Sequence, residues 1–297
     1  MTTLLHFSDP HLEEGVTEAS FGAFLNKRAL GFANLVVSRR GHFASAMPTI
    51  DALARFADER AVDFTLCTGD YTALGTTHEL TAARRTLDPL LTRPLGFATV
   101  PGNHDVYVDD APRAFESTFG EGLDSVDANY RWDDGRPYLR FVGESIAIIG
   151  LASARPNAIH RSSGEVPQRH LAALRDLARD PRLESRFVIL ALHYAPRLWN
   201  GRPDTALHGL ENHDALLDAA RGFRFGAIVF GHVHHRFTVS IPGLAIPLLG
   251  AGSATYVGRE GAWLWSVDDR TATAVPLELH GGSWRPANEP PLRLARS

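Results

Sequence analysis

Residues able to bind a metal ion or transfer a proton gather where short apolar runs of this chain end. The stretch 100–105, Val-Pro-Gly-Asn-His-Asp, follows the apolar run 97–100 and places Asn103, His104 and Asp105 in a row. A Pro-Gly pair ends the run, and ligands gather at the carboxyl ends of strands in α/β sheets. Taken alone, the stretch could equally be a Gly-Asn turn with a solvated His-Asp pair.

Four further apolar runs end in residues of the same types. Asp9 and His11 follow the run 3–7, and their spacing suits two ligands of one ion because side chains alternate along an extended segment. The other three ends carry Asp70, His193, and His232 with His234. A single histidine after a strand is more often an ordinary hydrogen-bonded residue than a ligand. Five such ends together predict one common site at one edge of a sheet.

The combined set indicates a particular metal chemistry. It holds two carboxylates, one amide oxygen and four imidazoles: Asp9, Asp70, Asn103, His11, His193, His232 and His234. Oxygen and imidazole ligands without a thiolate suit divalent ions such as Mn, Fe, Ni or Zn. Seven side chains exceed the four ligands of a tetrahedral zinc, so they fit two ions that share a carboxylate. Two ions roughly 3.5–4 Å apart serve in-line displacement at phosphorus.

The order of these blocks carries a family resemblance. Asp-x-His, Gly-Asp, Gly-Asn-His-Asp, a later His and Gly-His-x-His resemble the calcineurin-like metallophosphoesterases over residues 9–234, most closely the bacterial cyclic-nucleotide phosphodiesterase-like members. Gly75 and Glu79 after the second block, and Gly164 with Gln168 before the fourth, are further similarities. The resemblance implies an α/β fold, a four-layer α/β/β/α sandwich with two mixed central sheets flanked by helices.

The resemblance also implies a role for each site residue. One ion would be held by Asp9, His11 and His234, the other by Asn103, His193 and His232, with Asp70 bridging them. His104 would be the general acid or transition-state stabiliser near the leaving oxygen, with Asp105 orienting its imidazole. The cofactors would be two divalent ions, with Mn or Fe favoured over Zn or Ni. A hydroxide bridging them would attack a phosphodiester, with a cyclic nucleotide as one candidate substrate.

The segment 19–50 keeps a second function open. It has no Asp or Glu but contains Lys27, Arg28, Arg39 and Arg40, and its apolar residues fall near helical spacing. An amphipathic helix packed on the domain is one interpretation. The other is a basic lid that meets an anionic substrate or contacts a membrane surface peripherally. The second favours a pyrophosphatase or phosphatase acting on a lipid-linked or nucleotide-linked substrate.

A third class, a catalytically inactive binding scaffold, would be marked by missing ligands, and none is missing. The loops that could reach the site also contain Arg155, His160, Arg161, Arg202 and His208. Each of these is as readily interpreted as a plain surface residue.

The net charge, the cysteine count and the apolar runs of the chain exclude further classes of function. A net charge of −4 over 297 residues, with no basic stripe around the motifs, argues against nucleic acid as partner. The one cysteine, Cys67, excludes an intrachain disulfide and a multi-cysteine metal site. The start of the chain lacks the features of a signal peptide, and no apolar run reaches 18 residues. We therefore expect a cytoplasmic enzyme of small-molecule phosphoesters.

Alternating strand and helix patterns must position these residues. Strands over 3–7, 62–68 and 97–100, separated by helices, indicate a mainly parallel sheet. Further helices are expected at 48–60, 78–91, 112–119, 167–179 and 211–220, and a hairpin at 138–150. The β-rich stretch 237–279 reads as antiparallel and is expected to complete a second sheet. We expect one domain over 1–280 and an irregular tail over 281–297.

Overall fold

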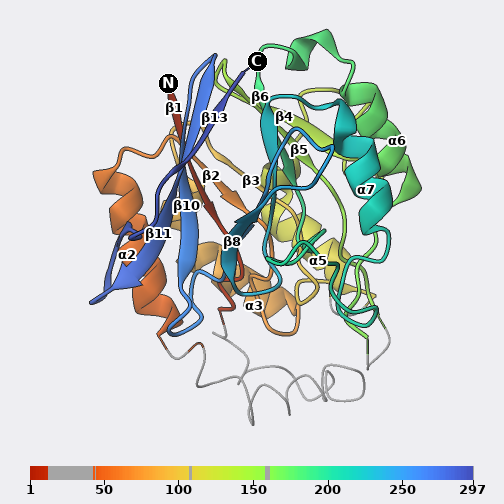
Figure 1. Cartoon of the computed structure of the whole chain (residues 1–297). Coiled ribbons are helices and arrows are strands. Elements are labelled where there is room, and N and C mark those ends of the chain that lie inside the picture. The colour runs from red at the N-terminus through yellow and green to blue at the C-terminus, as the bar shows by residue number, and fades with distance from the viewer. Residues whose placement is uncertain (13–42, 44, 107–108, 158–160, 297) are drawn as a thin grey trace.

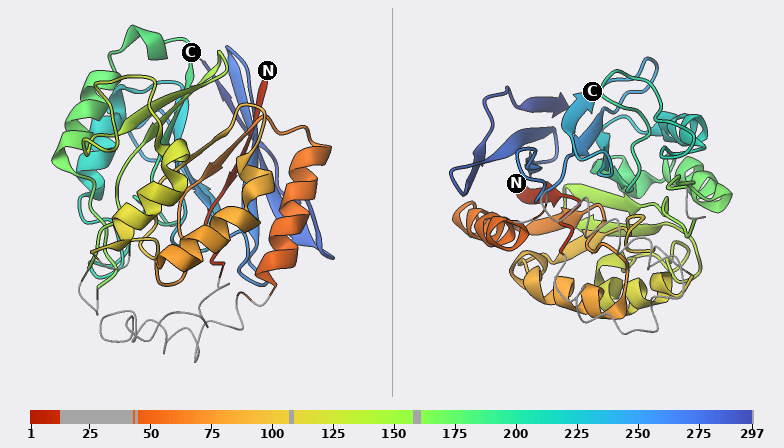
Figure 2. Two further views of the ribbon diagram at one scale, coloured as in Figure 1. Left: turned by 180° about the vertical axis from the view of Figure 1, so that it is seen from behind. Right: turned by 90° about the horizontal axis from the view of Figure 1, so that it is seen from below.

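Two mixed sheets lie face to face in the computed structural model, which describes residues 1–12, 43, 45–106, 109–157 and 161–296 (Figures 1 and 2). The first sheet runs in the order β12 (Ser283–Pro286), β11 (Thr271–His280), β10 (Gly261–Val267), β1 (Thr2–Phe7), β2 (Phe64–Cys67) and β3 (Phe97–Thr99), and β13 (Leu292–Ala295) also pairs with β11. The second runs in the order β4 (Tyr138–Val142), β5 (Ile146–Gly150), β6 (Phe187–Ala191), β7 (Gly226–Phe230), β9 (Leu248–Ala251) and β8 (Arg236–Val239).

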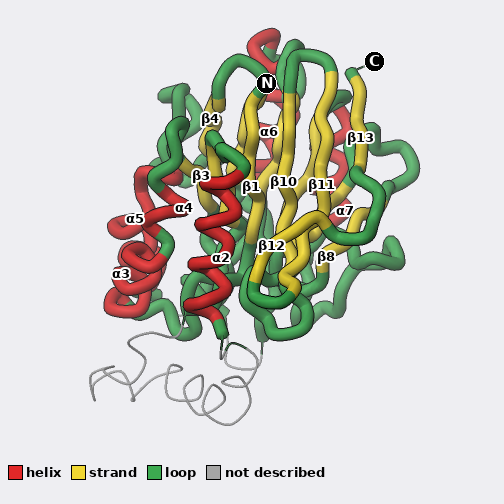
Figure 3. Tube along the Cα trace, turned by 90° about the vertical axis from the view of Figure 1, so that its left-hand side faces the viewer, coloured by secondary structure: helices red, strands yellow, loops and turns green. Residues whose placement is uncertain are grey.

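Helices cover the outer face of each sheet. The first is covered by α2 (Ala46–Glu59), α3 (Thr77–Thr86), α4 (Asp88–Leu91) and α5 (Ala111–Phe119), and Figure 3 shows α2 beside β12. The second is covered by α6 (Gln168–Leu177) and α7 (His213–Ala219). Short 3₁₀ turns lie at Gly120–Leu123, Pro181–Leu183 and Ala220–Gly222. The four expected layers are therefore present.

The continuous apolar runs of the second sheet follow from burial on both faces. Along β5, Ile146 and Ile148 pack into the core between the sheets, whereas Ala147 and Ile149 pack towards α6 and α7. Successive side chains of a strand point to opposite faces, so a strand between two covered faces must be apolar throughout. No helix in the described ranges is long and apolar enough to cross a membrane.

Parallel pairing brings the predicted site strands to one end of the sandwich. β1, β2 and β3 are parallel neighbours in the first sheet, and β6 and β7 are parallel neighbours in the second. All five strands therefore end on the same side, at the lower end in Figure 1.

The expectation for 237–279 is wrong in its sheet assignment. β8 and β9 join the second sheet, and β9 is parallel to β7. β10 and β11 return to the first sheet, where β10 pairs with β1. Strand periodicity is local, so it does not tell which distant strand is the neighbour.

The tail from 281 onward is not irregular, because β12 and β13 lie within it. β11 and β12 are joined by Gly281 and Gly282, both with positive φ (57° and 77°), as a two-residue hairpin turn requires. The buried Trp284 side chain then donates from Nε1 to Thr49 O on α2 (3.1 Å). The Gly-Gly pair was a readable hairpin signal.

One helix prediction also changes, and another falls largely on residues that the structure does not describe. The helix expected over 78–91 is divided into α3 and α4, because Pro89 lacks the N–H that a continuous helix would need. The amphipathic helix and lid expected within 19–50 lie largely outside the described residues. Of this segment the structure describes Phe43 and residues 45–50, and α2 begins at Ala46.

Candidate metal centre

The first group of predicted ligands converges on a small volume. Asp9, His11, Asp70 and His234 each offer one atom within 4.8 Å of all the others. His234 Nε2 lies 3.1 Å from Asp9 Oδ1 and 3.1 Å from His11 Nε2. Ligand atoms each about 2.1 Å from one ion are about 3 to 3.4 Å apart. The closest spacings in this group therefore match those around a single ion.

The second group lies on the other side of Asp70. Asn103 Oδ1 is 3.1 Å from His193 Nε2 and 3.0 Å from His232 Nδ1. His193 Nε2 is 3.4 Å from Asp70 Oδ2, and the same oxygen is 3.8 Å from His11 Nε2 in the first group. Asp70 Oδ2 therefore lies between the two groups, where a bridging ligand would be.

Backbone carbonyls fix the direction of the ligand imidazoles. The ring nitrogens remote from the site face carbonyls: His11 Nδ1 lies 3.3 Å from Thr72 O, His193 Nδ1 2.7 Å from Thr68 O, and His232 Nε2 2.9 Å from His208 O. A carbonyl only accepts, so these nitrogens carry protons. In a neutral ring the opposite nitrogen is then a lone pair directed at the carboxylate and amide oxygens of the site. This is the second-sphere pattern of metal-bound histidine.

Asp9 and Asp70 each use one carboxylate oxygen to accept a hydrogen bond from a backbone N–H and direct the other oxygen at the site. Asp9 Oδ2 accepts from His232 N (3.0 Å), and Asp70 Oδ1 accepts from His104 N (2.8 Å). The remaining oxygen of Asp9, Oδ1, is buried without a hydrogen-bond donor. A cation among these acceptors would offset their mutual repulsion, so the donor set fits two divalent ions.

Gly102 and Gly231 allow the backbone to lie close to the carboxylates of Asp70 and Asp9. A Cβ added to Gly102 would lie 2.1 Å from Asp70 Oδ1, and one added to Gly231 would lie 2.2 Å from Asp9 Oδ2. Any side chain at either position would displace a ligand carboxylate.

Backbone strain is concentrated in the same residues. Six described non-glycine residues have positive φ, and all but Ala61 are predicted metal ligands: Asp9, His11, Asp70, His232 and His234. Such a conformation costs about 1–3 kcal/mol per residue. The fold holds the strain at the centre, as is typical of functional sites.

The ionisable groups are strongly coupled. Burial opposes ionisation of Asp70, but the charges of His193 and His104 outweigh it and hold the Asp70 pKa well below its usual range. Burial lowers the pKa of His193, yet Asp70 overrides burial and raises it to about 9. Burial and the neighbouring His193 charge lower the His232 pKa to about 3. A positive charge is favoured between Asp70 and His193, whether a proton or a metal ion supplies it.

His104 stands beside the ligands as predicted, but Asp105 does not orient it. His104 is half-buried, its ring centroid is 5.3 Å from that of His11, and its Nδ1 donates to Ala73 O (2.8 Å). Asp105 instead accepts from the backbone N–H groups of Asp70 (2.7 Å), Tyr71 (2.8 Å), Thr72 (3.2 Å) and Gly102 (2.9 Å). Burial and the Asp70 charge raise the Asp105 pKa to about 7. Asp105 therefore joins the second and third ligand loops.

The flanking loops contribute differently from what their sequence suggested. Arg155 pairs with Glu165 and Glu211, and Arg161 also pairs with Glu211. His208 contributes its backbone carbonyl to His232. His160 lies outside the described residues. Sequence reasoning also missed the packing of rings on the ligands: Tyr194 lies 4.2 Å from His232 and Phe43 lies 4.6 Å from His11, centroid to centroid.

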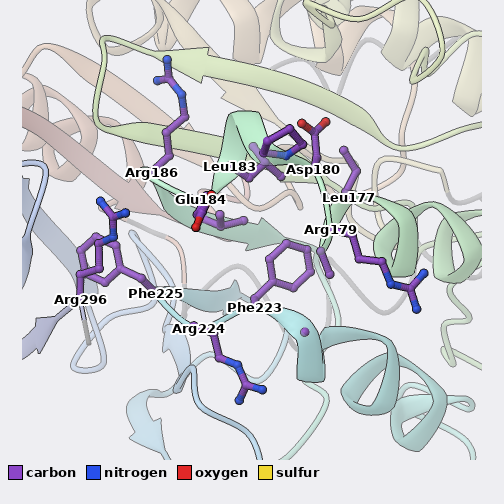
Figure 4. Close-up of a pocket in the computed structure, with 14 residues that line it drawn as sticks. Leu177, Arg179, Asp180, Leu183, Glu184, Arg186, Phe223, Arg224, Phe225 and Arg296 are labelled. Atoms are coloured by element: carbon purple, nitrogen blue, oxygen red, sulfur yellow. The ribbon is translucent and has the colours of Figure 1, made fainter.

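A cavity of about 470 Å³ lies elsewhere, beside the amino ends of β6 and β7 (Figure 4). Its lining includes Arg179, Arg186, Arg224 and Arg296, whose side chains spread apart in the close-up, and none of the predicted site residues. It is separate from the metal centre.

Comparisons with known proteins identify a family and agree with the fold. The sequence profile described as calcineurin-like phosphoesterase matches residues 2–236. Curated protein sequences give no significant match. A dimetal phosphatase from Danio rerio superposes with a TM-score of 0.69 at 12% identity, covering 100% of this chain and 99% of that one.

Two other solved structures are similar over most of this chain. The purple acid phosphatase PPD1 from yellow lupin, Lupinus luteus, has a TM-score of 0.63 at 12% identity over 99% of this chain and 54% of that one. PhoD has a TM-score of 0.57 at 9% identity over 93% and 65%, respectively. At these identities the superpositions establish the shared fold.

Proposed function

Because the chain belongs to the calcineurin-like phosphoesterase family, we propose that it is a binuclear metal-dependent hydrolase of phosphodiesters. The observation that carries the proposal is the arrangement of two ligand groups around Asp70 Oδ2, with His104 beside them. When bound, two divalent ions would lower the pKa of water and polarise phosphoryl oxygens, so that water attacks phosphorus near neutral pH.

The side chains of the site would bind the two ions and transfer a proton. Asp9, His11 and His234 would hold one ion, and Asn103, His193 and His232 the other, with Asp70 shared. Asn103 is a neutral ligand and leaves the pair less negatively charged than a third carboxylate would. His104 donates Nδ1–H to Ala73 O. In the imidazolium the second proton lies on Nε2 and would pass to the leaving oxygen, which leaves the neutral Nδ1–H ring.

The charge around the centre favours a diester over a monoester. Guanidinium groups bind the dianion of a monoester well, through two parallel hydrogen bonds. Among the described arginines of the flanking loops, three are already paired with carboxylates: Arg155 with Glu165 and Glu211, Arg161 with Glu211, and Arg197 with Asp214. A diester carries one negative charge, which two divalent ions can offset. We place cyclic nucleotides first among diesters because the motif blocks most resemble that branch.

Exposed apolar side chains support a second candidate, hydrolysis of a lipid-linked phosphate or pyrophosphate at a membrane surface. Trp199 is 57% exposed, and its ring lies 5.6 Å from His235, next to the ligand His234. Leu207 (52% exposed) precedes His208, and Val257 (46%) follows Tyr256, whose ring lies 5.6 Å from that of His234. Apolar groups beside a polar site suit an amphiphilic substrate.

A panel assay tests both candidates. Mn-loaded enzyme is offered aryl monoesters and diesters, cyclic nucleotides, and nucleotide-linked lipids in detergent, with chelated enzyme as the blank. We expect turnover of diesters above monoesters, and a His104→Ala variant that keeps both ions but loses about 10²- to 10⁴-fold in kcat. A triple Trp199→Ala, Leu207→Ala, Val257→Ala variant would lose activity selectively on lipid substrates if the second candidate holds.

Three outcomes would count against the proposal. Enzyme loaded with two ions that prefers monoesters contradicts the diester assignment. Full activity of His104→Ala on a diester with a poor leaving group contradicts the role of His104. Equal activity before and after chelation contradicts metal dependence.

A further inference from the structure

The loop that follows β2 is held almost entirely by two buried carboxylates. Asp105 accepts from the N–H groups of Asp70, Tyr71 and Thr72. Glu79, at the start of α3, accepts from those of Ala73 (3.3 Å), Leu74 (3.2 Å) and Thr76 (3.0 Å). The remaining N–H, of Gly75, donates to Thr72 Oγ1 (3.2 Å). Seven consecutive amides thus have acceptors although the loop is neither helix nor strand.

The carbonyls of this loop point the other way, at the site. Thr72 O faces His11 Nδ1 (3.3 Å), and Ala73 O accepts from His104 Nδ1 (2.8 Å). Two neighbouring carbonyls therefore set the ring orientation of one metal ligand and of the predicted general acid. Their positions depend on the amides of the same loop, because a peptide unit is planar and rigid.

Glu79 does more than cap a helix. Its Oε2 accepts from Thr76 N and Thr76 Oγ1, and Thr76 Oγ1 accepts from Glu79 N, which completes the capping box of α3. Its other oxygen, Oε1, is not needed for the cap and accepts from Ala73 N and Leu74 N. The side chain is fully buried, at 1% exposure. Burying a carboxylate costs free energy. The cap accounts for only one oxygen of Glu79, so the contacts that Oε1 makes with Ala73 and Leu74 indicate a further function.

We propose that Glu79 is a positioning residue for His104. Through Ala73 and Leu74 it fixes the Ala73 carbonyl, which keeps one proton on His104 Nδ1 and directs Nε2 toward the leaving oxygen, so that Nε2 carries the transferable proton when the ring is the imidazolium. The inference rests on the proposed function in one respect, the role of His104 as proton donor. Glu79 itself touches neither substrate nor metal ligand.

The chain offers a matched control. Thr76→Ala removes the hydroxyl half of the cap and should cost about 1 kcal/mol of stability, but it leaves the Oε1 contacts with Ala73 and Leu74 in place. Glu79→Gln keeps the size of the side chain but has one acceptor oxygen instead of two, so it cannot serve both Thr76 and the amides of Ala73 and Leu74. A purely structural role predicts the same activity loss from both variants at equal loss of thermal stability.

The kinetic test uses a series of aryl phosphodiesters with leaving groups of increasing pKa. Glu79→Gln should lower kcat about 10- to 100-fold, most for the poorest leaving group, with KM and the metal content unchanged. Thr76→Ala should show no dependence on the leaving group. Glu79→Gln in a His104→Ala background should cost little more, because both changes remove one function.

A second readout does not depend on activity. In Zn-loaded protein at a pH where the His104 ring is neutral, ¹⁵N NMR should report the Nδ1–H tautomer in the wild type and in Thr76→Ala, and a tautomer mixture in Glu79→Gln. An unchanged His104 tautomer, or a kcat loss equal for all leaving groups and additive with His104→Ala, overturns the inference. Full activity of His104→Ala overturns the proposed function instead, and the NMR result then decides the positioning role alone.

Discussion

Two histidines of this protein are equally buried but lie in different environments. His170 lies on α6 at 1% exposure, where Ala152 N donates to its Nδ1 (3.3 Å) and its Nε2 donates to Gly135 O (3.2 Å). His193 is also buried, and its Nδ1 donates to Thr68 O. Its other nitrogen, however, faces Asp70 Oδ2 and Asn103 Oδ1.

The difference shows what distinguishes a ligand from a core histidine. At His170 the backbone satisfies both nitrogens, and burial lowers its pKa to about 4, so the ring stays neutral. At His193 one nitrogen is fixed and the other is directed at acceptors, so the pKa is raised to about 9 against the effect of burial. Burial alone therefore does not identify a metal ligand; the partner of the second nitrogen does.

The largest expected effect separates the two environments directly. His193→Ala should lower the metal content below two ions per chain and reduce kcat by on the order of 10³-fold. The reason is that it removes one of the side chains expected to hold the second ion together with Asp70 and Asn103. His170→Gln should keep two ions and near-normal kcat while lowering the melting temperature. Metal analysis and initial rates on both variants check this, and equal metal loss in both would erase the distinction.

A smaller effect concerns stability. Ions that bind only the folded chain stabilise it by about 2.7 kcal/mol when their concentration is 100 times the Kd. Adding Mn to chelated enzyme should therefore raise the unfolding midpoint of the wild type and of His170→Gln, and much less that of His193→Ala. Denaturant titrations with and without Mn measure this. A full metal-induced shift in His193→Ala would contradict the ligand assignment.

The smallest effect is a pH dependence specific to His170. Its pKa is about 4 in the fold and about 6.5 in the unfolded chain, so between these values the unfolded chain binds more protons. The stability contributed by the neutral ring is complete above pH 6.5 and is lost as the pH falls toward 4. From pH 7 to pH 5 the loss is roughly 2 kcal/mol.

His170→Gln removes this contribution, so its stability should fall less than that of the wild type over the same pH interval. Unfolding titrations of the two metal-free proteins at both pH values provide the comparison. Parallel pH curves would show that His170 is not held neutral by burial.

The site was predictable from sequence to the extent that its signals are local. Each ligand follows an apolar run, and five parallel strands end on one side, so the ligand set could be proposed before any geometry was known. That β10 and β11 belong to the first sheet could not be predicted, because the pairing of β10 with β1 joins residues more than 250 positions apart. Strand patterns carry no partner information.

The role of Asp105 was misjudged for a related reason. Adjacency to His104 suggested a contact between the two side chains, but the carboxylate turns back to the loop that follows β2, more than 30 residues earlier. The capping box of Thr76 and Glu79 was a readable local signal. The proposed role of Glu79 in positioning His104 depends on the direction of the Ala73 carbonyl, which only the folded structure shows.

The most direct test of the central claim, that two ions share Asp70, is anomalous diffraction from crystals grown with Mn. We predict two peaks per chain, both about 2.0–2.3 Å from the Asp70 carboxylate. One should lie among Asp9, His11 and His234, the other among Asn103, His193 and His232. A single peak at full occupancy, or two peaks of which only one contacts Asp70, would contradict the account.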